Sequence, residues 1–213
     1  IQPPWVYSLI ALKLLGYPLD HPVMKRGLEA FEGAYRVEDE EVYTPQACIS
    51  PVWDTALAMI ALLDAGIPPD HEALVRAARW LLKEQVFGGG DWQVKVKGVE
   101  PGGWSFEFDN DVYPDVDDTA EVMMALHRTR LPEGERKAWA IERGLRWVLG
   151  MQSTDGGWGA FDKDNTRRII THMPFCDFGE VLDYPTEAVT AHVVEMLGLF
   201  GYDPSFPPAA RAL

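Results

Sequence analysis

The chain has 213 residues and a formal net charge of −14, from 19 basic and 33 acidic side chains. This acidic excess, without any Lys/Arg-rich stretch, argues against a nucleic-acid partner. Two cysteines, Cys48 and Cys176, provide no disulfide framework and favour a reducing compartment. The longest apolar run, residues 55–63, is much shorter than the roughly 20 residues that span a bilayer. The chain opens on Ile1 without a signal peptide and stops as a helix begins, so we expect a piece of a longer protein.

Apolar residues spaced three and four apart predict a chain made almost entirely of helices. The expected helices cover residues 7–15, 22–35, 51–65, 70–85, 116–129, 136–151 and 186–199, and a last one begins near residue 207. Gly16, Gly66 and Gly201 close three of them, as glycine commonly does at helix ends. Only residues 92–99 alternate enough to predict a short β-hairpin arm.

The predicted helices pair, and the pairs repeat. Residues 52–56, 116–120 and 187–191 align, with a threonine at one position in all three. The second helix of a pair carries an Arg-x3-Trp-x4-Gln element, from which Gln85 leads to Trp92 and Gln152 leads to Trp158. Helical hairpins bury their faces by stacking, with these tryptophans as staples between repeats. We therefore expect an all-α fold, an incomplete (α/α)6 barrel of hairpin repeats with Gln-to-Trp (QW-type) motifs, in which residues 1–213 form a single partial domain.

Three carboxylates crowd the start of one predicted helix, in Asp115-Val116-Asp117-Asp118-Thr119. Aspartate and threonine are good helix caps, because their side chains accept hydrogen bonds from unpaired N–H groups, and that role alone could explain them. Carboxylates so close together cannot all ionise cheaply. In a dry, apolar site one of them stays protonated at neutral pH and becomes a Brønsted acid.

These elements together resemble the squalene–hopene cyclases, a bacterial family of class II triterpene cyclases. The likeness rests on the aspartate motif and the Gln-to-Trp elements, and it covers essentially the whole chain but a minor part of the family's length. The family has two α-barrel domains, and the resemblance implies that this chain is most of the domain that carries the catalytic acid. Further matching segments are Ile1-Gln2-Pro3-Pro4-Trp5, Gly102-Gly103-Trp104-Ser105-Phe106, Gly156-Gly157-Trp158-Gly159-Ala160 and Phe175-Cys176-Asp177-Phe178-Gly179-Glu180.

The resemblance implies that Asp117 protonates the terminal alkene of squalene, without a metal or cofactor. Asp115 and Asp118 would raise the proton occupancy of Asp117. His192, which the repeat alignment sets near Thr119, would donate a hydrogen bond to Asp117 and make its remaining O–H more acidic. Such an acid must be kept dry, because water would level its acidity. The helix dipole acts in the opposite direction, since it favours the ionised carboxylate.

After protonation, a carbocation must be steered without being trapped, and aromatic faces stabilise cations without attacking them. The residues that the resemblance implies as substrate-binding are Trp53, Phe106, Phe161, Phe175, Cys176, Ile1 and Gln2. Phe175 and Cys176 match a constriction on the substrate's way in, and Ile1 and Gln2 match the region where cyclisation ends.

The sequence departs from the family at two positions. Phe161 stands where a tyrosine is familiar, and Ala188 replaces an acidic residue one turn before His192.

The implied reaction turns squalene into the pentacyclic products hopene and hopanol, with another linear polyprene of the C35 class as the alternative substrate. The resemblance further implies a monotopic protein on the cytoplasmic face of the bacterial cell membrane, bound through parts mostly outside this chain. A homodimer of the full-length protein is a further expectation. We expect the 213 residues alone to be inactive, because much of the cavity wall is missing.

Other classes remain open at this point. An inverting (α/α)-barrel glycosidase needs its two carboxyls roughly 6.5–9.5 Å apart, and one crowded aspartate cluster fits that separation poorly. Cys176, Asp177 and His192 could ligate zinc in a prenyltransferase-like barrel, and the aspartates could bind magnesium for a diphosphate. A non-catalytic helical-repeat binding module is the remaining alternative, and it predicts that Asp117→Asn changes nothing.

Overall fold

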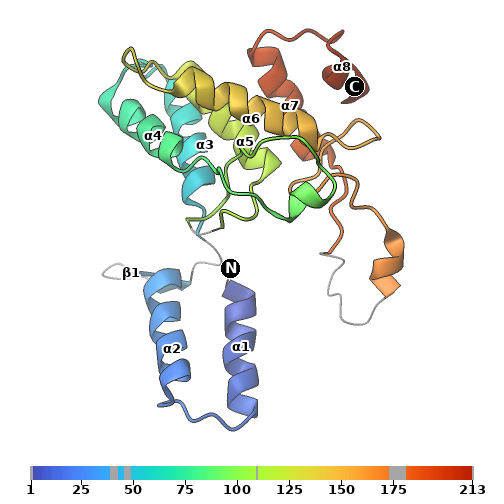
Figure 1. Cartoon of the computed structure of the whole chain (residues 1–213). Coiled ribbons are helices and arrows are strands. Elements are labelled where there is room, and N and C mark those ends of the chain that lie inside the picture. Colours follow the sequence, from blue (N-terminus) through green and yellow to red (C-terminus); the bar gives the residue numbers. More distant parts are fainter. Residues whose placement is uncertain (1, 39–42, 46–48, 109, 173–180, 213) are drawn as a thin grey trace. The chain divides into compact units, whose positions relative to one another are not determined.

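The computed structural model describes residues 2–38, 43–45, 49–108, 110–172 and 181–212. It divides into two compact units, Ile1–Ser50 and Pro51–Leu213 (Figure 1), which are treated separately below. Of the sequence-predicted substrate residues, Ile1, Phe175 and Cys176 lie outside the described residues.

The first unit is a helical hairpin followed by a minimal sheet. Its elements are α1 (Gln2–Leu14), α2 (Pro22–Tyr35), β1 (Arg36–Glu38) and β2 (Tyr43–Pro45). Helices α1 and α2 pack on each other, and the indole Nε1 of Trp5 donates a 3.0 Å hydrogen bond to the carbonyl of Gly27. Strands β1 and β2 are antiparallel, with Val37 opposite Thr44. The sequence analysis did not predict these two short strands.

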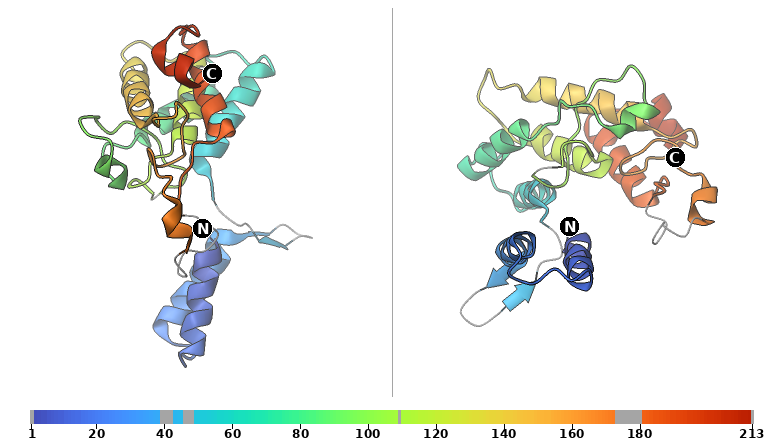
Figure 2. Two further views of the ribbon diagram at one scale, coloured as in Figure 1. Left: turned by 90° about the vertical axis from the view of Figure 1, so that its right-hand side faces the viewer. Right: turned by 60° about the horizontal axis from the view of Figure 1, so that its bottom comes forward.

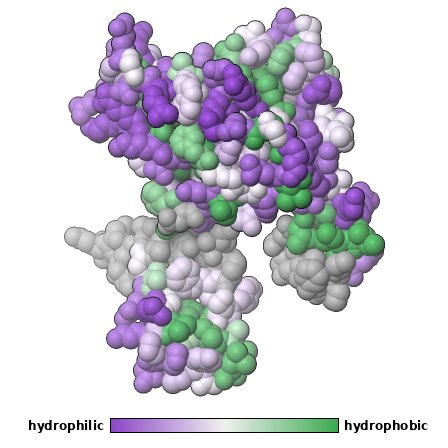
Figure 3. Space-filling view, in the orientation of Figure 1, coloured by the Kyte–Doolittle hydropathy of each residue, from purple (hydrophilic) through white to green (hydrophobic). Residues whose placement is uncertain are grey.

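Apolar side chains remain exposed on the helices and loop of this first unit, and Figure 3 shows apolar surface there. A two-helix unit is too small to bury all its apolar residues, and exposed patches of this kind are typical of surfaces that pack against other protein. The large exposed apolar residues are Tyr7, Ile10, Leu14, Leu15, Tyr17, Leu19, Val23 and Leu28.

The second unit is built around helix α5. Its elements are α3 (Pro51–Asp64), α4 (Glu72–Lys83), the 3₁₀ helix η1 (Asp91–Val94), α5 (Val116–Arg128), α6 (Lys137–Met151), the 3₁₀ helix η2 (Arg168–His172), α7 (Glu187–Leu199) and α8 (Pro207–Ala212). Helix α5 packs against α3, α4, α6 and α7 (Figure 2), and its residues from Asp118 to Leu126 are all buried. Any side chain at its first turn is therefore held by several neighbouring helices.

The all-α fold class is confirmed, and the predicted helices match the observed ones to within a few residues, apart from an earlier start of α1. The predicted hairpin at residues 92–99 is wrong. A 3₁₀ helix occupies residues 91–94, where the N–H of Gln93 donates to the carbonyl of Gly90 at 3.2 Å and the N–H of Lys95 donates to the carbonyl of Trp92 at 3.3 Å, which are the three-residue hydrogen bonds of a 3₁₀ helix. The ring of Trp92 packs edge-on against Trp147, with centroids 5.9 Å apart. Closure into an (α/α)6 barrel stays a prediction.

The Gln-to-Trp element of the first repeat ends at Trp104 rather than at Trp92. The side-chain Nε2 of Gln85 donates a 2.7 Å hydrogen bond to the carbonyl of Gly102. The indole Nε1 of Trp104 donates at 2.6 Å to the carbonyl of Leu81, one turn before Gln85. Trp92 is buried, but its indole N–H has no hydrogen-bond partner. The sequence alignment chose the nearer tryptophan because it did not anticipate the inserted loop and 3₁₀ helix.

The second repeat shows the same contacts, which supports this correction. Gln152 Nε2 donates a 2.7 Å hydrogen bond to the carbonyl of Gly156. Trp158 Nε1 donates at 2.8 Å to the carbonyl of Val148, again one turn before the glutamine. Trp104 and Trp158 are therefore equivalent, and each fixes the segment that precedes the next helix of the α3–α5–α7 row.

Candidate active site at the start of helix α5

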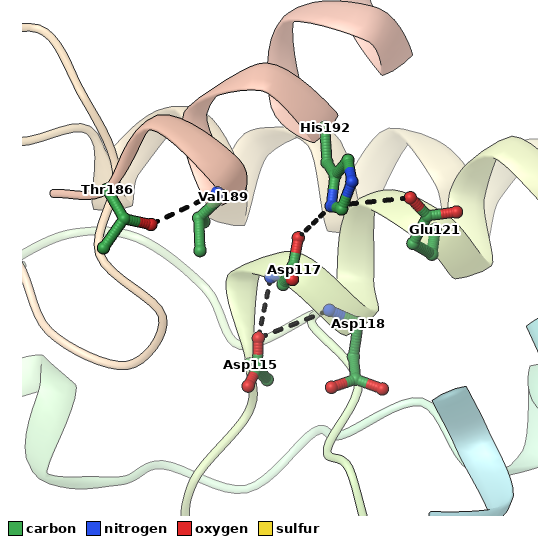
Figure 4. A network of polar contacts seen from close by, with 7 residues as sticks. All are labelled: Asp115, Asp117, Asp118, Glu121, Thr186, Val189 and His192. Carbon is green, nitrogen blue, oxygen red and sulfur yellow. Dashed lines mark hydrogen bonds and ion pairs between the residues drawn. The ribbon is translucent and has the colours of Figure 1, made fainter. Parts of the chain in front are cut away.

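Asp115 caps helix α5. Its backbone is extended, with φ −106° and ψ 133°, and its Oδ1 accepts the N–H groups of Asp117 at 2.7 Å and of Asp118 at 3.3 Å (Figure 4). These are two of the N–H groups that a helix start leaves without an internal partner. The capping role is therefore real for Asp115, and it leaves the side chains of Asp117 and Asp118 available for other contacts.

A buried frame holds this first turn in place. The hydroxyl of Thr119 accepts the N–H of Trp104 at 2.8 Å and donates to the carbonyl of Asp115 at 2.5 Å. The N–H of Asp115 in turn donates to the carbonyl of Trp104 at 2.7 Å. A Cβ on Gly103 would lie 2.9 Å from the Thr119 hydroxyl and 2.8 Å from the ring of Trp147, so only glycine permits this approach. The position of the aspartates thus depends on the Gly-Gly-Trp segment.

Asp117 and His192 meet across the contact between α5 and α7. The imidazole Nδ1 of His192 lies 2.6 Å from Asp117 Oδ1 (Figure 4). Both side chains are largely covered, with 34% of His192 and 23% of Asp117 exposed. Burial by itself would lower the pKa of His192, but the hydrogen bond to Asp117 and the nearby carboxylates outweigh it and raise that pKa. The geometry therefore favours a histidine that carries a proton toward the Asp117 carboxyl.

Glu121 is a fourth carboxyl at this site, and the sequence analysis missed it. It lies one turn after Asp117 on α5, its side chain is only 7% exposed, and its Oε1 is 3.6 Å from His192 Nδ1. Burial raises the pKa of Glu121, and the charge of His192 counteracts that effect. The repeat alignment held the signal that could have found it, because Glu121 and His192 occupy the same repeat position on successive helices.

The two carboxyls that flank Asp117 hold their protons to near-neutral pH. Burial raises the pKa of Asp115 to about 7, although its hydrogen bonds from the α5 N–H groups act against the rise. Burial, together with the charges of Asp115 and Asp117, raises the pKa of Asp118 to about 8. Asp118 points away from His192 in Figure 4, and its buried Oδ1 has no hydrogen-bond partner. The cluster as a whole therefore carries fewer negative charges than it has carboxyls.

One of the sequence-predicted aromatic residues lies beside the Asp117–His192 pair. The ring centroid of Trp53, on α3, is 6.4 Å from that of His192. Phe106 is partly buried just after Trp104, and Phe161 is 39% exposed. Gln2 lies in α1 of the first unit. The second unit thus brings one predicted aromatic next to the predicted acid and its histidine.

Asp183, in the segment before α7, supports the aspartate cluster. The sequence analysis did not predict this role. The Asp183 carboxylate accepts three consecutive backbone N–H groups, from Ala160 at 3.1 Å, Phe161 at 2.7 Å and Asp162 at 2.6 Å. The carbonyl of Ala160 then accepts the N–H of Val116 at 2.8 Å, at the first residue of α5. The carboxylate therefore fixes the loop against which the helix begins.

The metal alternatives concern the aspartates at the start of α5 and the proposed zinc ligands. Within the described parts of the chain, no group of three or more His, Cys, Asp or Glu side chains is placed to hold a metal ion. The side chains of Asp115 and Asp118 point away from that of Asp117 (Figure 4), so the aspartates do not converge on one point. Cys176 and Asp177, which the zinc alternative needs, lie outside the described residues.

Comparison with known proteins decides the family. The family model described as squalene-hopene cyclase C-terminal domain matches residues 49–213, which is most of the chain. The chain belongs to the squalene-hopene cyclase family. The model for the squalene-hopene cyclase N-terminal domain matches residues 1–41, so the two matches meet close to the boundary between the two structural units.

Curated relatives align with all or nearly all of the chain. The squalene–hopene cyclase of Alicyclobacillus acidocaldarius is 54% identical over 214 residues, covering 100% of this chain and 34% of the relative. That of Schizosaccharomyces japonicus is 43% identical over 221 residues, covering 100% of this chain and 33% of the relative. Dammaradiene synthase of Dryopteris crassirhizoma is 44% identical over 198 residues, covering 93% of this chain and 29% of the relative. The chain thus spans about a third of these relatives' length.

None of the helices in the described part of the chain is both long and apolar enough to cross a bilayer.

Proposed function

We propose that the protein containing this chain is a class II triterpene cyclase in which Asp117 protonates a terminal alkene of squalene. The observation that carries the proposal is the 2.6 Å contact between Asp117 Oδ1 and His192 Nδ1, made between helices α5 and α7. A family likeness alone would support any use of the fold, whereas an acid held against a histidine at a buried helix start fits proton donation. The cyclase names of the aligned relatives point in the same direction.

The proton-transfer step needs no group beyond those in the chain and the substrate. The alkene π electrons take the proton of Asp117, a C–H bond forms, and the positive charge moves to the more substituted carbon. The electrons of the broken O–H bond stay on Asp117 as a carboxylate. The N–H of His192 stabilises that carboxylate, which lowers the energy of the products of proton transfer and hence the barrier.

The surroundings of Asp117 keep negative charge low before this step. Burial holds the protons of Asp115 and Asp118 to near-neutral pH, so these neighbours add little charge that would attract and neutralise the new cation. The ring of Trp53 lies beside His192, with ring centroids 6.4 Å apart, and is the proposed aromatic partner of the new cation. Phe106 and Phe161 extend the proposed lining, together with Phe175, Cys176, Ile1 and Gln2 from the resemblance.

The wider setting is also part of the proposal. Squalene is the proposed substrate, converted to hopene when the last cation loses a proton or to hopanol when it takes up water, and a C35 polyprene is the alternative. Such substrates dissolve in membranes, so we propose monotopic binding at the cytoplasmic face of the cell membrane, and a homodimer of the full-length protein. The 213-residue chain alone should be inactive, because it spans about a third of its relatives.

The test uses the full-length parent protein with squalene in detergent, with and without EDTA, and analyses the products by gas chromatography and mass spectrometry. We expect Asp117→Asn to lower turnover by at least about 10³-fold with its melting temperature unchanged, because the amide has no acidic proton to give. A matched control is Asp70→Asn, at an exposed ion pair with Arg130, which should keep wild-type turnover.

Two results would contradict the proposal. Full activity of the Asp117→Asn variant would reduce the aspartate cluster to a helix cap. Loss of wild-type activity in EDTA would favour the magnesium or zinc alternatives, whereas a folded wild type without any squalene product would favour another polyprene.

A further inference from the structure

A second carboxylate approaches the ring nitrogen that contacts the acid. Glu121 Oε1 lies 3.6 Å from Nδ1 of His192, while Asp117 Oδ1 lies 2.6 Å from the same atom. Both carboxyls come from one face of α5, one turn apart, and Figure 4 shows His192 pointing between them. Glu121 is the more deeply buried, with 7% of its side chain exposed against 23% for Asp117. A buried carboxylate is costly unless it is paired, so its position beside the histidine needs an explanation.

The other groups around His192 do not replace Glu121. On the same helix, the residue one turn before the histidine is Ala188, which has no charge to offer. Glu195 follows His192 within one turn of α7, and its charge also raises the pKa of His192. Glu195 is exposed, however, so water screens that charge. Helix α3 contributes the apolar ring of Trp53. Among the described residues, the buried anions that face Nδ1 are therefore Asp117 and Glu121.

This leaves a difficulty at the start of the proposed reaction, because Asp117 is then protonated and neutral. A neutral Asp117 cannot attract a proton to Nδ1, and its own O–H could turn toward an unprotonated Nδ1. The acidic proton would then be bound to the histidine rather than available to the alkene. A fixed negative charge beside Nδ1 prevents this, since it favours the protonated ring and keeps the N–H as the donor.

We propose that Glu121 is a positioning residue that keeps the proton on Nδ1 of His192, so that this N–H always donates to Asp117. The inference rests on the proposed function and adds a residue to it. Glu121 touches neither substrate nor transferred proton, and it acts through the direction of one hydrogen bond. The charge of the protonated histidine counters the burial that raises the pKa of Glu121, so the two groups hold each other in the charged state.

The test is the pH dependence of squalene turnover by the full-length enzyme carrying Glu121→Gln, which keeps the size of the side chain and removes its charge. We expect the alkaline limb of the rate profile to move down by roughly one pH unit, because an anion at this distance shifts a neighbouring pKa by about that amount. On that limb turnover should fall about tenfold, while the rate at low pH stays close to wild type. Glu195→Gln is the matched control, and its shift should be much smaller.

A second variant separates charge from packing. Ala188→Asp places a carboxylate one turn before His192 at the exposed second residue of α7, where a helix start tolerates an acid. We expect it to move the alkaline limb of the wild type upward, and to restore the limb in the Glu121→Gln background. This variant also tests the idea if Glu121→Gln does not fold.

The outcomes distinguish the two proposals. A wild type that cyclises squalene, with an unshifted alkaline limb in both Glu121→Gln and Ala188→Asp, overturns the role of Glu121 and leaves the proposed function intact. A wild type that cyclises neither squalene nor a C35 polyprene, or an Asp117→Asn variant that keeps full activity, overturns the proposed function itself.

Discussion

The starts of helices α5 and α7 are built on one frame and carry different chemistry. In both, the hydroxyl of a threonine one turn into the helix accepts the N–H of the repeat tryptophan. Thr119 accepts from Trp104 at 2.8 Å, and Thr190 accepts from Trp158 at 3.1 Å. A capping side chain precedes each helix, Asp115 in one case and a threonine in the other. The frame is therefore a property of the repeat, and it places a helix start without deciding what that start does.

The chemistry lies at two positions, one turn apart, on these equivalent helices. Helix α5 presents Asp117 and Glu121, whereas α7 presents Ala188 and His192 at the matching positions. Because α5 and α7 pack side by side, the second position of α7 faces both positions of α5. A repeated frame thus brings the proposed acid and its partner together through substitutions in neighbouring copies, with no special loop required.

After loss of the acid itself, the largest expected effect comes from removing the α7 side of this pair. In the full-length enzyme, His192→Phe should lower the squalene turnover about 10- to 100-fold, because a hydrogen bond to a charged group contributes about 1.5–3 kcal/mol. His192→Gln should lose less, since its amide can still donate to Asp117. Turnover measured by gas chromatography checks both variants, with melting temperature as the control for folding. Equal rates for His192→Phe and wild type would show that the pair is structural only.

Breaking the frame itself should affect the two helices unequally. Thr119 is fully buried, whereas Thr190 is partly buried. Thr119→Val leaves the N–H of Trp104 without a partner in a dry environment, so we expect a loss of about 1–3 kcal/mol in stability. Thr190→Val should cost about half as much, because its hydrogen bond is longer, at 3.1 Å, and Thr190 itself is partly exposed. Thermal unfolding of the full-length variants measures the difference, and equal losses would contradict a frame that is tighter at α5.

The sequence predicted the parts of this arrangement that repeat locally. Helical spacing and closing glycines located the long helices, and the repeat alignment placed His192 near the start of α5. It failed where the repeat carries an insertion. The alignment assigned to Trp92 the role that Trp104 has. A loop and a 3₁₀ helix are inserted between Gln85 and Trp104, but the hydrogen bonds that these two residues make are the same as in the other repeat.

Two supporting carboxylates were missed for a different reason, although the repeat alignment pairs Glu121 with His192. Glu121 faces a helix that is distant in the sequence, and Asp183 accepts backbone N–H groups, which leave no trace in side-chain patterns. Both residue types are also common on solvated surfaces, so only their burial and their partners distinguish them. Such contacts depend on how the elements pack, which local periodicity does not contain.

The aspartate cluster at α5, which α7 lacks, should make stability depend on pH. The ordinary pKa of aspartate is 3.8, and burial raises it to about 7 for Asp115 and about 8 for Asp118. Between pH 4 and pH 8 the folded protein therefore binds more protons than the unfolded chain, so these groups' stabilising contribution is lost as pH rises through 7 and 8. Asp118→Asn removes one titration, and relative to wild type it should gain about 1–2 kcal/mol of stability at pH 8 over roughly pH 6.5, because one pH unit between the two pKa values is equivalent to about 1.4 kcal/mol.

Melting temperatures of the two proteins across this pH range check the sign. Glu142→Gln, in an exposed ion pair with Arg146, is the control and should parallel the wild type. A wild type that gains stability relative to Asp118→Asn as the pH rises would contradict the assignment of a buried, protonated Asp118.

The smallest expected effect distinguishes the tryptophan of the α5 frame from its neighbour. Trp104→Phe removes a buried donor and leaves the carbonyl of Leu81 without it, whereas Trp92→Phe removes an indole N–H that has no partner. Both variants lose a similar volume from the core, so the cavity cost largely cancels in the comparison. We expect Trp104→Phe to be the less stable of the two by about 1 kcal/mol, from parallel melts. If Trp92→Phe were the less stable variant, Trp92 rather than Trp104 would be the tryptophan of the Gln-to-Trp element. The equivalence of the two helix starts would then lose its main support.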